Sequence, residues 1–184
     1  ISSMVTSKVF FLFFIGIIQS CNIIHFFMSE QIHTYFTIEM IYLWLNLGVL
    51  PFWFVLIFFP YSKLCKIFTT SIFPILILSL TYCYVIYTIF QGGYDFLNNF
   101  KLYLSLAELL YLFSDSSFLI LIWIHLLAIN LFCGGWIVND YQKFGISKIL
   151  MFFPLLITYL IGPLGITIYW LIRIFYAKRI SIYD

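Results

Sequence analysis

The chain has 184 residues, of which 64% are hydrophobic, 23% are aromatic and only 9% are charged. Its apolar runs exceed what a soluble core of this size needs, so the composition excludes an ordinary soluble domain and indicates an integral membrane protein. The net charge of +2 is small and the basic residues occur in short clusters, so nothing here argues for nucleic acid as a partner.

Five segments are apolar enough, and long enough or nearly so, to be membrane-spanning helices. A helix needs about 20 apolar residues to cross a hydrocarbon core of about 30 Å. The segments are residues 9–28, 38–60, 67–90, 118–138 and 149–173. We therefore predict an all-α fold, a polytopic transmembrane helix bundle with four core spans and one additional N-terminal helix.

The N-terminal segment follows Lys8 and has the charged and apolar parts of a signal peptide, with a faint resemblance to a lipoprotein cleavage site before Cys21. We expect the segment to be retained as a short spanning or interfacial helix. The chain then divides into residues 1–35, an N-terminal membrane helix and loop, and residues 36–184, a four-span membrane domain.

The middle of the chain predicts a helical hairpin followed by an interfacial helix. Pro60 ends the segment 38–60, and a short basic turn leads into the segment 67–90, so the two segments should lie antiparallel. Residues 94–115 are rich in leucine around polar groups such as Glu108 and are short for a span, so we expect an amphipathic helix in the membrane interface.

The fourth segment carries most of the polar residues at membrane depth. At about 100° per residue, His125, Trp136 and Asp140 fall on one stripe of the helix, which suits an internal cavity. His125 is either a structural histidine bonded to a carbonyl or a tyrosine, or a catalytic or ligand-binding group. Asp140 is either a solvated turn residue that pairs with Lys143 or Lys148, or a second catalytic candidate.

Another face of the same helix carries small and amide side chains. Asn130 is expected to bond across helices or to contact a ligand, and Gly134 and Gly135 are expected to allow close helix packing. In the last segment, Gly162 and Pro163 break the helix, which we interpret as a kink in one long span or as the wall of a ligand site.

Metal and cofactor sites are not predicted. The four cysteines lie in or beside apolar segments without a CxxC pattern, so we interpret them as small hydrophobic residues. The three histidines show no paired spacing that would support a haem. Bound lipid is compatible with the pattern. With five spans, the positive residues divide almost equally between the two sides, so the orientation is not determined.

The region from Ile38 to Asp184 resembles the abscisic-acid-deficient-four-like family. The motifs that carry the resemblance are residues 105–115 (SLAELLYLFSD), 123–140 (WIHLLAINLFCGGWIVND), 152–156 (FFPLL) and 162–166 (GPLGI). The resemblance implies a four-helix membrane fold. It also implies a link to carotenoids, because plant and algal members are required to make neoxanthin from violaxanthin, whereas many bacterial members have no assigned activity. Asn130 stands where an acidic residue of the family is expected, which removes an ionisable group.

Two functions remain open. The first is a non-catalytic accessory or structural subunit of a larger membrane complex, such as a complex of the respiratory chain. Its location would be the mitochondrial inner membrane or another energy-transducing membrane. It draws on the aromatic-rich apolar surface, the non-Met first residue and the expectation that both ends of the chain are ordered by other subunits. Bacterial and plastid membranes are alternative locations.

The second is a carotenoid-modifying or polyisoprenoid-binding membrane protein. In this interpretation His125, Asn130, Trp136, Gly162 and Pro163 shape an apolar pocket, and His125 or Asp140 moves a proton during epoxide opening. The lipid bilayer is a partner in both cases. Whether the protein is an enzyme is not decided by the residues.

Overall fold

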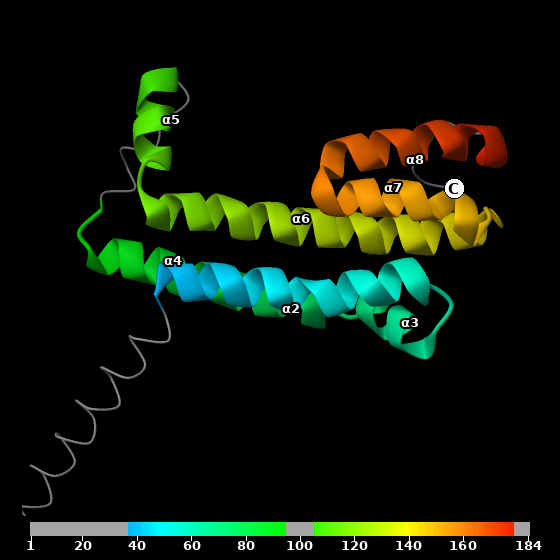
Figure 1. Cartoon of the computed structure of the whole chain (residues 1–184), viewed down its shortest axis with the longest axis horizontal. Coiled ribbons are helices and arrows are strands. Elements are labelled where there is room, and N and C mark those ends of the chain that lie inside the picture. Colours follow the sequence, from blue (N-terminus) through cyan, green and yellow to red (C-terminus); the bar gives the residue numbers. More distant parts are fainter. Residues whose placement is uncertain (1–36, 95–104, 179–184) are drawn as a thin grey trace, which may run out of the picture. The chain divides into compact units, whose positions relative to one another are not determined.

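The computed structural model describes residues 37–94 and 105–178. In these ranges all regular structure is helical, as predicted (Figure 1). The helices are α2 (Ile38–Phe58), α3 (Lys63–Thr70), α4 (Phe73–Gln91), α5 (Leu106–Phe113), α6 (Ser116–Lys143), α7 (Lys148–Leu160) and α8 (Gly162–Ala177). The predicted N-terminal helix and the expected order of both chain ends fall outside the described residues.

Three of these helices, α2, α4 and α6, have the length and hydropathy of membrane spans. The chain is thus a membrane protein with three span-length helices in its described part. The expected count of four core spans is not reproduced, because the predicted segment 149–173 is divided into two helices that are too short to span.

The predicted span 67–90 is divided at Ser71 and Ile72 into α3 and α4. Ser62 begins α3 by accepting a hydrogen bond from the backbone N–H of Cys65 at 3.0 Å. The chain is extended at Ser71, where φ is −100° and ψ is 148°, and Pro74 lies in the first turn of α4, where its missing N–H costs nothing. The second arm of the predicted hairpin therefore starts as a separate short helix.

The helix α3 is amphipathic and lies outside the spans. Cys65 faces inward and is 1% exposed. Burial raises the pKa of its thiol to about 11, so the thiol is protonated at neutral pH and packs as a small apolar group.

The predicted span 149–173 is a hairpin of two helices, so the prediction of a single kinked helix is wrong. The chain reverses at Ile161, where φ is −139° and ψ is 82°, and α7 and α8 lie side by side (Figure 1). At about 1.5 Å per residue, arms of 13 and 16 residues are shorter than a hydrocarbon core of about 30 Å. Both ends of the hairpin therefore lie at the same end of the bundle.

Close approach of the two arms depends on Gly165. A Cβ atom on Gly165 would lie 2.3 Å from the backbone nitrogen of Thr158 on the facing arm. Backbone at this distance cannot give way, so any larger residue would separate the helices.

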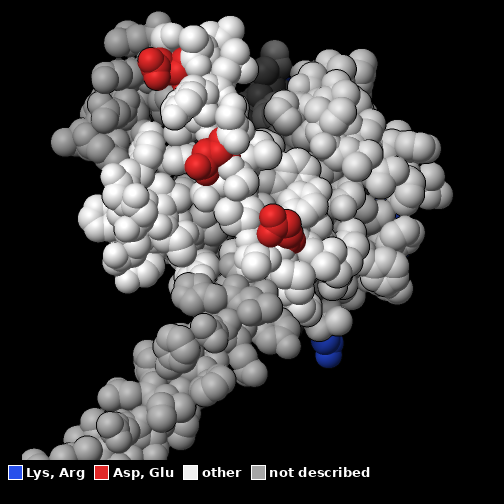
Figure 2. Space-filling view, turned by 60° about the vertical axis from the view of Figure 1, so that its left-hand side comes forward, with Lys and Arg blue, Asp and Glu red and all other residues white. Residues whose placement is uncertain are grey.

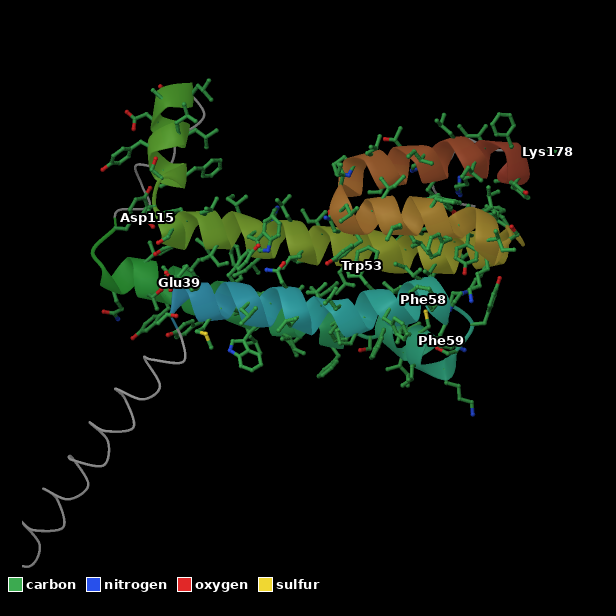
Figure 3. All side chains as sticks on the ribbon, in the orientation of Figure 1. Glu39, Trp53, Phe58, Phe59, Asp115 and Lys178 are labelled. Carbon is green, nitrogen blue, oxygen red and sulfur yellow. The ribbon has the colours of Figure 1, made fainter. Side chains whose placement is uncertain are left out.

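The helix α6 is the centre of the bundle and contacts α3, α4, α5, α7 and α8. On one side, a Cβ atom on Gly134 would lie 2.7 Å from the indole of Trp53, so the bare glycine makes room for this α2 side chain. Trp53, which Figure 3 labels, is 2% exposed. Its ring meets Tyr159 of α7 edge-on at 5.4 Å. The glycine thus allows one aromatic ring to connect three helices.

The two ends of the bundle differ in charge. Three contacts gather the end of α2, the end of α6, the start of α7 and the end of α8: Gln142 to Pro60, Lys148 to Phe58 and Arg173 to Asp140. All described basic residues lie at this basic end: Lys63, Lys66, Lys143, Lys148, Arg173 and Lys178. Glu108 and Asp115 lie at the opposite, acidic end. Figure 2 shows this end from the front, and little basic surface is seen on it. Figure 3 labels Asp115 and Lys178, which mark the two ends.

This asymmetry replaces the nearly equal division of positive charge that five spans predict. Folding the last segment into a hairpin moves Arg173 and Lys178 to the side of Lys143 and Lys148. Positive residues near span ends favour the side from which the protein is inserted. We therefore expect the basic end to face the cytoplasm when the protein is made in a bacterium.

Labelling of single cysteines tests this orientation. In a background with the native cysteines replaced, Lys143→Cys should react with a membrane-impermeant maleimide in inside-out vesicles, and Glu108→Cys should react in right-side-out vesicles. Labelling of both variants from the same side, or the reverse pattern, would contradict the assignment.

Candidate functional site

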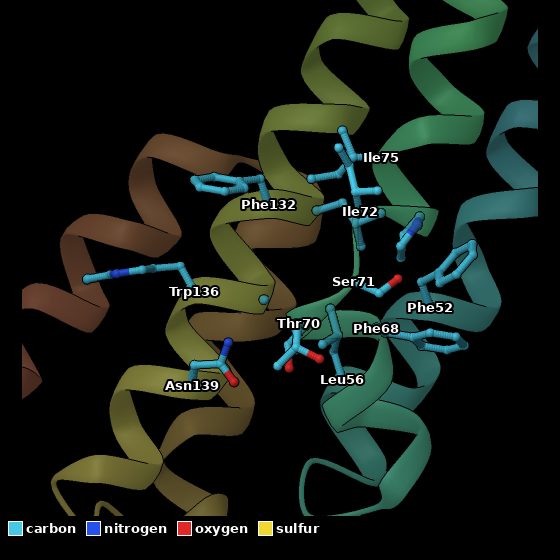
Figure 4. Close-up of a pocket in the computed structure, with 14 residues that line it drawn as sticks. Phe52, Leu56, Phe68, Thr70, Ser71, Ile72, Ile75, Phe132, Trp136 and Asn139 are labelled. Atoms are coloured by element: carbon cyan, nitrogen blue, oxygen red, sulfur yellow. The ribbon is translucent and has the colours of Figure 1, made fainter.

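A hollow, here called the apolar groove, lies between α6 and the helices α2, α3 and α4 (Figure 4). Its volume is about 430 Å³. Most of its wall is apolar and aromatic, contributed by Phe52, Leu56, Phe68, Ile72, Ile75, Leu131 and Phe132. Phe52 and Phe68 meet edge-on with their centroids 4.8 Å apart. A hollow of this size and lining is of the kind that binds apolar small molecules.

A second hollow of about 300 Å³, here called the basic cavity, adjoins the groove. Thr69, Thr70 and Asn139 line both hollows, so the two share a wall. The remaining lining of the basic cavity is polar or charged and consists mainly of Tyr61, Ser62, Lys63, Lys66 and Gln142. The Gln142 amide donates to the carbonyl oxygen of Pro60 at 2.9 Å, which fixes the α2 to α3 turn against α6.

Two of the residues selected from the sequence line the apolar groove, namely Gly135 and Trp136. A Cβ atom on Gly135 would lie 3.7 Å from the Thr69 methyl group, so the glycine sits in ordinary contact with α3. Trp136 also stacks on Trp170 of α8, with centroids 6.1 Å apart and planes inclined by 25°. This side chain therefore belongs both to the groove and to the interface with the hairpin.

The other selected residues lie elsewhere. His125 is exposed on α6 and lines neither hollow, and Pro163 is exposed in the first turn of α8. Asn130 is 9% exposed, and its side chain contacts Gly162. A Cβ atom on Gly162 would lie 2.0 Å from the side-chain oxygen of Asn130. Asn130 and Gly162 thus form a helix contact between α6 and α8, away from the groove.

Asp140 is part of a buried polar cluster. It is 5% exposed, and one of its oxygens, Oδ2, accepts hydrogen bonds from Nε of Arg173 at 2.6 Å and from the hydroxyl of Tyr169. Arg173 is 1% exposed and Tyr169 is fully buried. The expectation that Asp140 is a solvated residue paired with Lys143 or Lys148 is therefore wrong. Lys148 instead donates to the carbonyl oxygen of Phe58 at 2.5 Å.

Aromatic rings surround this cluster. The guanidinium carbon of Arg173 lies 4.8 Å from the ring centroids of both Phe144 and Trp170. Such contacts favour a cation that has lost its water. The ion pair has the partners that a buried charge requires, and it fastens α8 to the end of α6.

Arg173 and Tyr169 were not selected from the sequence, although a signal was present. Arg173 stands between Leu171, Ile172, Ile174 and Phe175, and an ionisable residue inside an apolar run needs a partner of opposite charge. Asp140 is the acidic residue near the end of the preceding span. The expectation of one long helix hid this pair, because a straight helix would carry Arg173 to the opposite end.

The candidate ionisable residues lie apart from one another and from the two hollows. In residues 37–94 and 105–178, no three His, Cys, Asp or Glu side chains come together as a metal site would require. Asp140 is held in an ion pair and His125 stands apart, so neither faces the hollows. The groove and the basic cavity together offer one apolar and one polar compartment.

Breaking the buried pair should be far more damaging than replacing it. Arg173→Met leaves Asp140 buried and uncompensated, so we expect a loss of about 3–5 kcal/mol of stability, whereas Arg173→Met with Asp140→Leu should recover most of that loss. Thermal unfolding in detergent measures both variants, with Lys178→Met as the control at the exposed cation that follows the last residue of α8. Additive losses in the double variant would show that the pair does not act as a unit.

Comparison with known proteins places the chain in a family. A family model described as ABA DEFICIENT 4-like matches residues 40–169, more than two thirds of the chain. The match covers α6, the α7 arm and the groove-forming helices. No curated protein and no solved structure matches the chain. The resemblance seen in the sequence is confirmed, and the protein is a member of the ABA DEFICIENT 4-like family.

Proposed function

We propose that this membrane protein binds one long polyisoprenoid or carotenoid molecule in the apolar groove. The observation that carries the proposal is the groove itself, a hollow of about 430 Å³ with aromatic walls between span-length helices. Lipid tails can fill an apolar surface anywhere, but a hollow lined on several sides favours a particular occupant by shape.

Membership of the family supports this ligand class. Plant and algal members are linked to the conversion of violaxanthin to neoxanthin, and both are long polyenes with polar ends. In this chain the groove ends at Thr69, Thr70 and Asn139, which offer hydroxyl and amide groups to the polar end of such a molecule. We assign binding and leave out a catalytic step, because His125 and Asp140 do not line the groove.

Filling the groove should abolish binding without unfolding the protein. In Gly135→Leu the new side chain extends from the groove wall, so we expect the affinity for a carotenoid or a C20 isoprenoid alcohol to fall at least about tenfold, the equivalent of about 1.4 kcal/mol. Binding is measured by fluorescence quenching of the protein in nanodiscs.

Two controls separate blockage from misfolding. Gly48→Leu makes the same change in a spanning helix where nothing lies within 4 Å, so it should bind like the wild type. Gly135→Ala adds an atom at ordinary contact distance and should also bind normally. Equal affinity of Gly135→Leu and Gly48→Leu would exclude the groove as the binding site.

The second candidate is an accessory subunit of a larger membrane assembly, in a mitochondrial or other energy-transducing membrane. The observation that favours it is α5, which has no buried residue although it is largely apolar. Leu106 is 71% exposed, Leu110 61% and Tyr111 81%. A short helix that presents such a surface is suited to another polypeptide as well as to the membrane interface.

Purification in mild detergent distinguishes the two candidates. An accessory subunit should co-migrate with other proteins in stoichiometric amount, and Leu106→Ser with Leu110→Ser should release them because the apolar contact is lost. Mass spectrometry of proteins and extracted pigments in the same sample provides the measurement. A chain that migrates alone with bound isoprenoid or carotenoid would exclude the subunit function.

A further inference from the structure

We propose that the ligand of the apolar groove carries a phosphate head, bound in the basic cavity by Lys63 and Lys66. The ligand class is then a single-chain polyisoprenyl phosphate, not a neutral carotenoid or alcohol. The inference rests on the proposed binding function and goes further by assigning the chemistry of the head.

The first step is that the two hollows adjoin. Thr69 and Thr70 on α3 and Asn139 on α6 line both of them, so the two compartments meet at these three residues. A molecule with its chain in the groove therefore places its end at the basic cavity. The basic cavity has a volume of about 300 Å³ and several polar and charged side chains, which is room for more than a hydroxyl group.

The second step is charge. Lys63 and Lys66 are three residues apart on α3, so they lie on the same face of the helix, and both line the cavity. No acidic residue lines either hollow. In the described part of the chain the buried Asp140 is paired with Arg173, and neither lysine has an ion-pair partner. The cavity thus holds two positive charges that an anion would balance.

The third step is hydrogen bonding. The Ser62 hydroxyl accepts from the backbone N–H of Cys65, which leaves its own proton to donate. The Asn139 amide also lines the cavity and can donate. The hydroxyls of Thr69 and Thr70 both donate to the Lys66 carbonyl, so they offer only acceptor oxygens. Two lysines, one hydroxyl and one amide form a donor set suited to phosphate oxygens.

The fourth step is the number of chains and the position of the head. Among the described residues, the apolar groove shares its lining with the cavity and suits one chain, whereas a bilayer phospholipid has two. The cavity lies at the basic end of the bundle, where a charged head would be in the interface while its chain reaches toward the spans. Both features favour a single-chain isoprenyl phosphate.

The test measures binding of matched ligands to the full chain in phosphatidylcholine nanodiscs. The probes are geranylgeranyl phosphate, geranylgeraniol, dioleoyl phosphatidic acid and inorganic phosphate. We expect geranylgeranyl phosphate to bind at least about tenfold more tightly than geranylgeraniol, and added salt to weaken only the binding of the phosphate. Lys63→Gln with Lys66→Gln should remove the difference between the two isoprenoids.

The control variant is Lys143→Gln, which removes a positive charge from the same end of the bundle without touching either hollow. It should keep the preference for the phosphate. The lysines are exposed, so thermal unfolding should not change, and the salt dependence of the wild type provides a second measurement that needs no variant.

Each of the other outcomes contradicts a different part of the proposal. Equal binding of geranylgeranyl phosphate and geranylgeraniol would leave the groove function intact and exclude the phosphate head. No binding of either isoprenoid or of a carotenoid would exclude the proposed function as well. Equal competition by phosphatidic acid would exclude the single-chain ligand, and displacement by inorganic phosphate alone would identify an anion site without an isoprenoid.

Discussion

The buried ion pair between Asp140 and Arg173 is the interaction on which the arrangement of the last third of the chain depends. Two charges that are buried away from water are stable only when they are paired with each other. Here the Tyr169 hydroxyl also donates to Asp140, and the rings of Phe144 and Trp170 contact the Arg173 guanidinium. Because the partners come from α6 and α8, the pair requires the chain to turn back after α7. The same turn collects the basic residues at one end and so creates the charge difference that should orient the protein in the membrane.

Small residues on α6 provide the complementary constraint. Gly134 makes room for the Trp53 ring of α2, and Gly135 lies against Thr69 of α3, so adjacent glycines contact two neighbouring helices. In a membrane, where lipid is as apolar as leucine, such packing replaces hydrophobic association. The same part of α6 also contributes Gly135 and Trp136 to the wall of the apolar groove. Packing and binding surface therefore arise from the same few residues.

The fold was predictable where local composition decides it and unpredictable where distant residues do. The spans α2 and α6 and the all-helical class follow from hydrophobic length alone, and the family motifs lie in the part that the family model matches. The division of the segment 67–90 was missed because Pro74 is also compatible with a continuous helix. The hairpin at Ile161 was missed because Gly162 and Pro163 permit either a kink or a reversal, and only the contact with α6 selects the reversal.

The same limit on what the sequence can predict applies to the candidate site. The sequence by itself determined that this is a helical membrane protein of a particular family, that Trp136 lies within a predicted span, and that Asp140 follows the end of that span. Only the tertiary structure decided that Trp136 lines a groove, that Asp140 pairs with Arg173, that His125 stands outside, and that Lys63 and Lys66 face a cavity beside the groove. The physical reason is that hydrophobicity is a local property of the chain, whereas a cavity or a buried ion pair is made by side chains that folding brings together from distant positions.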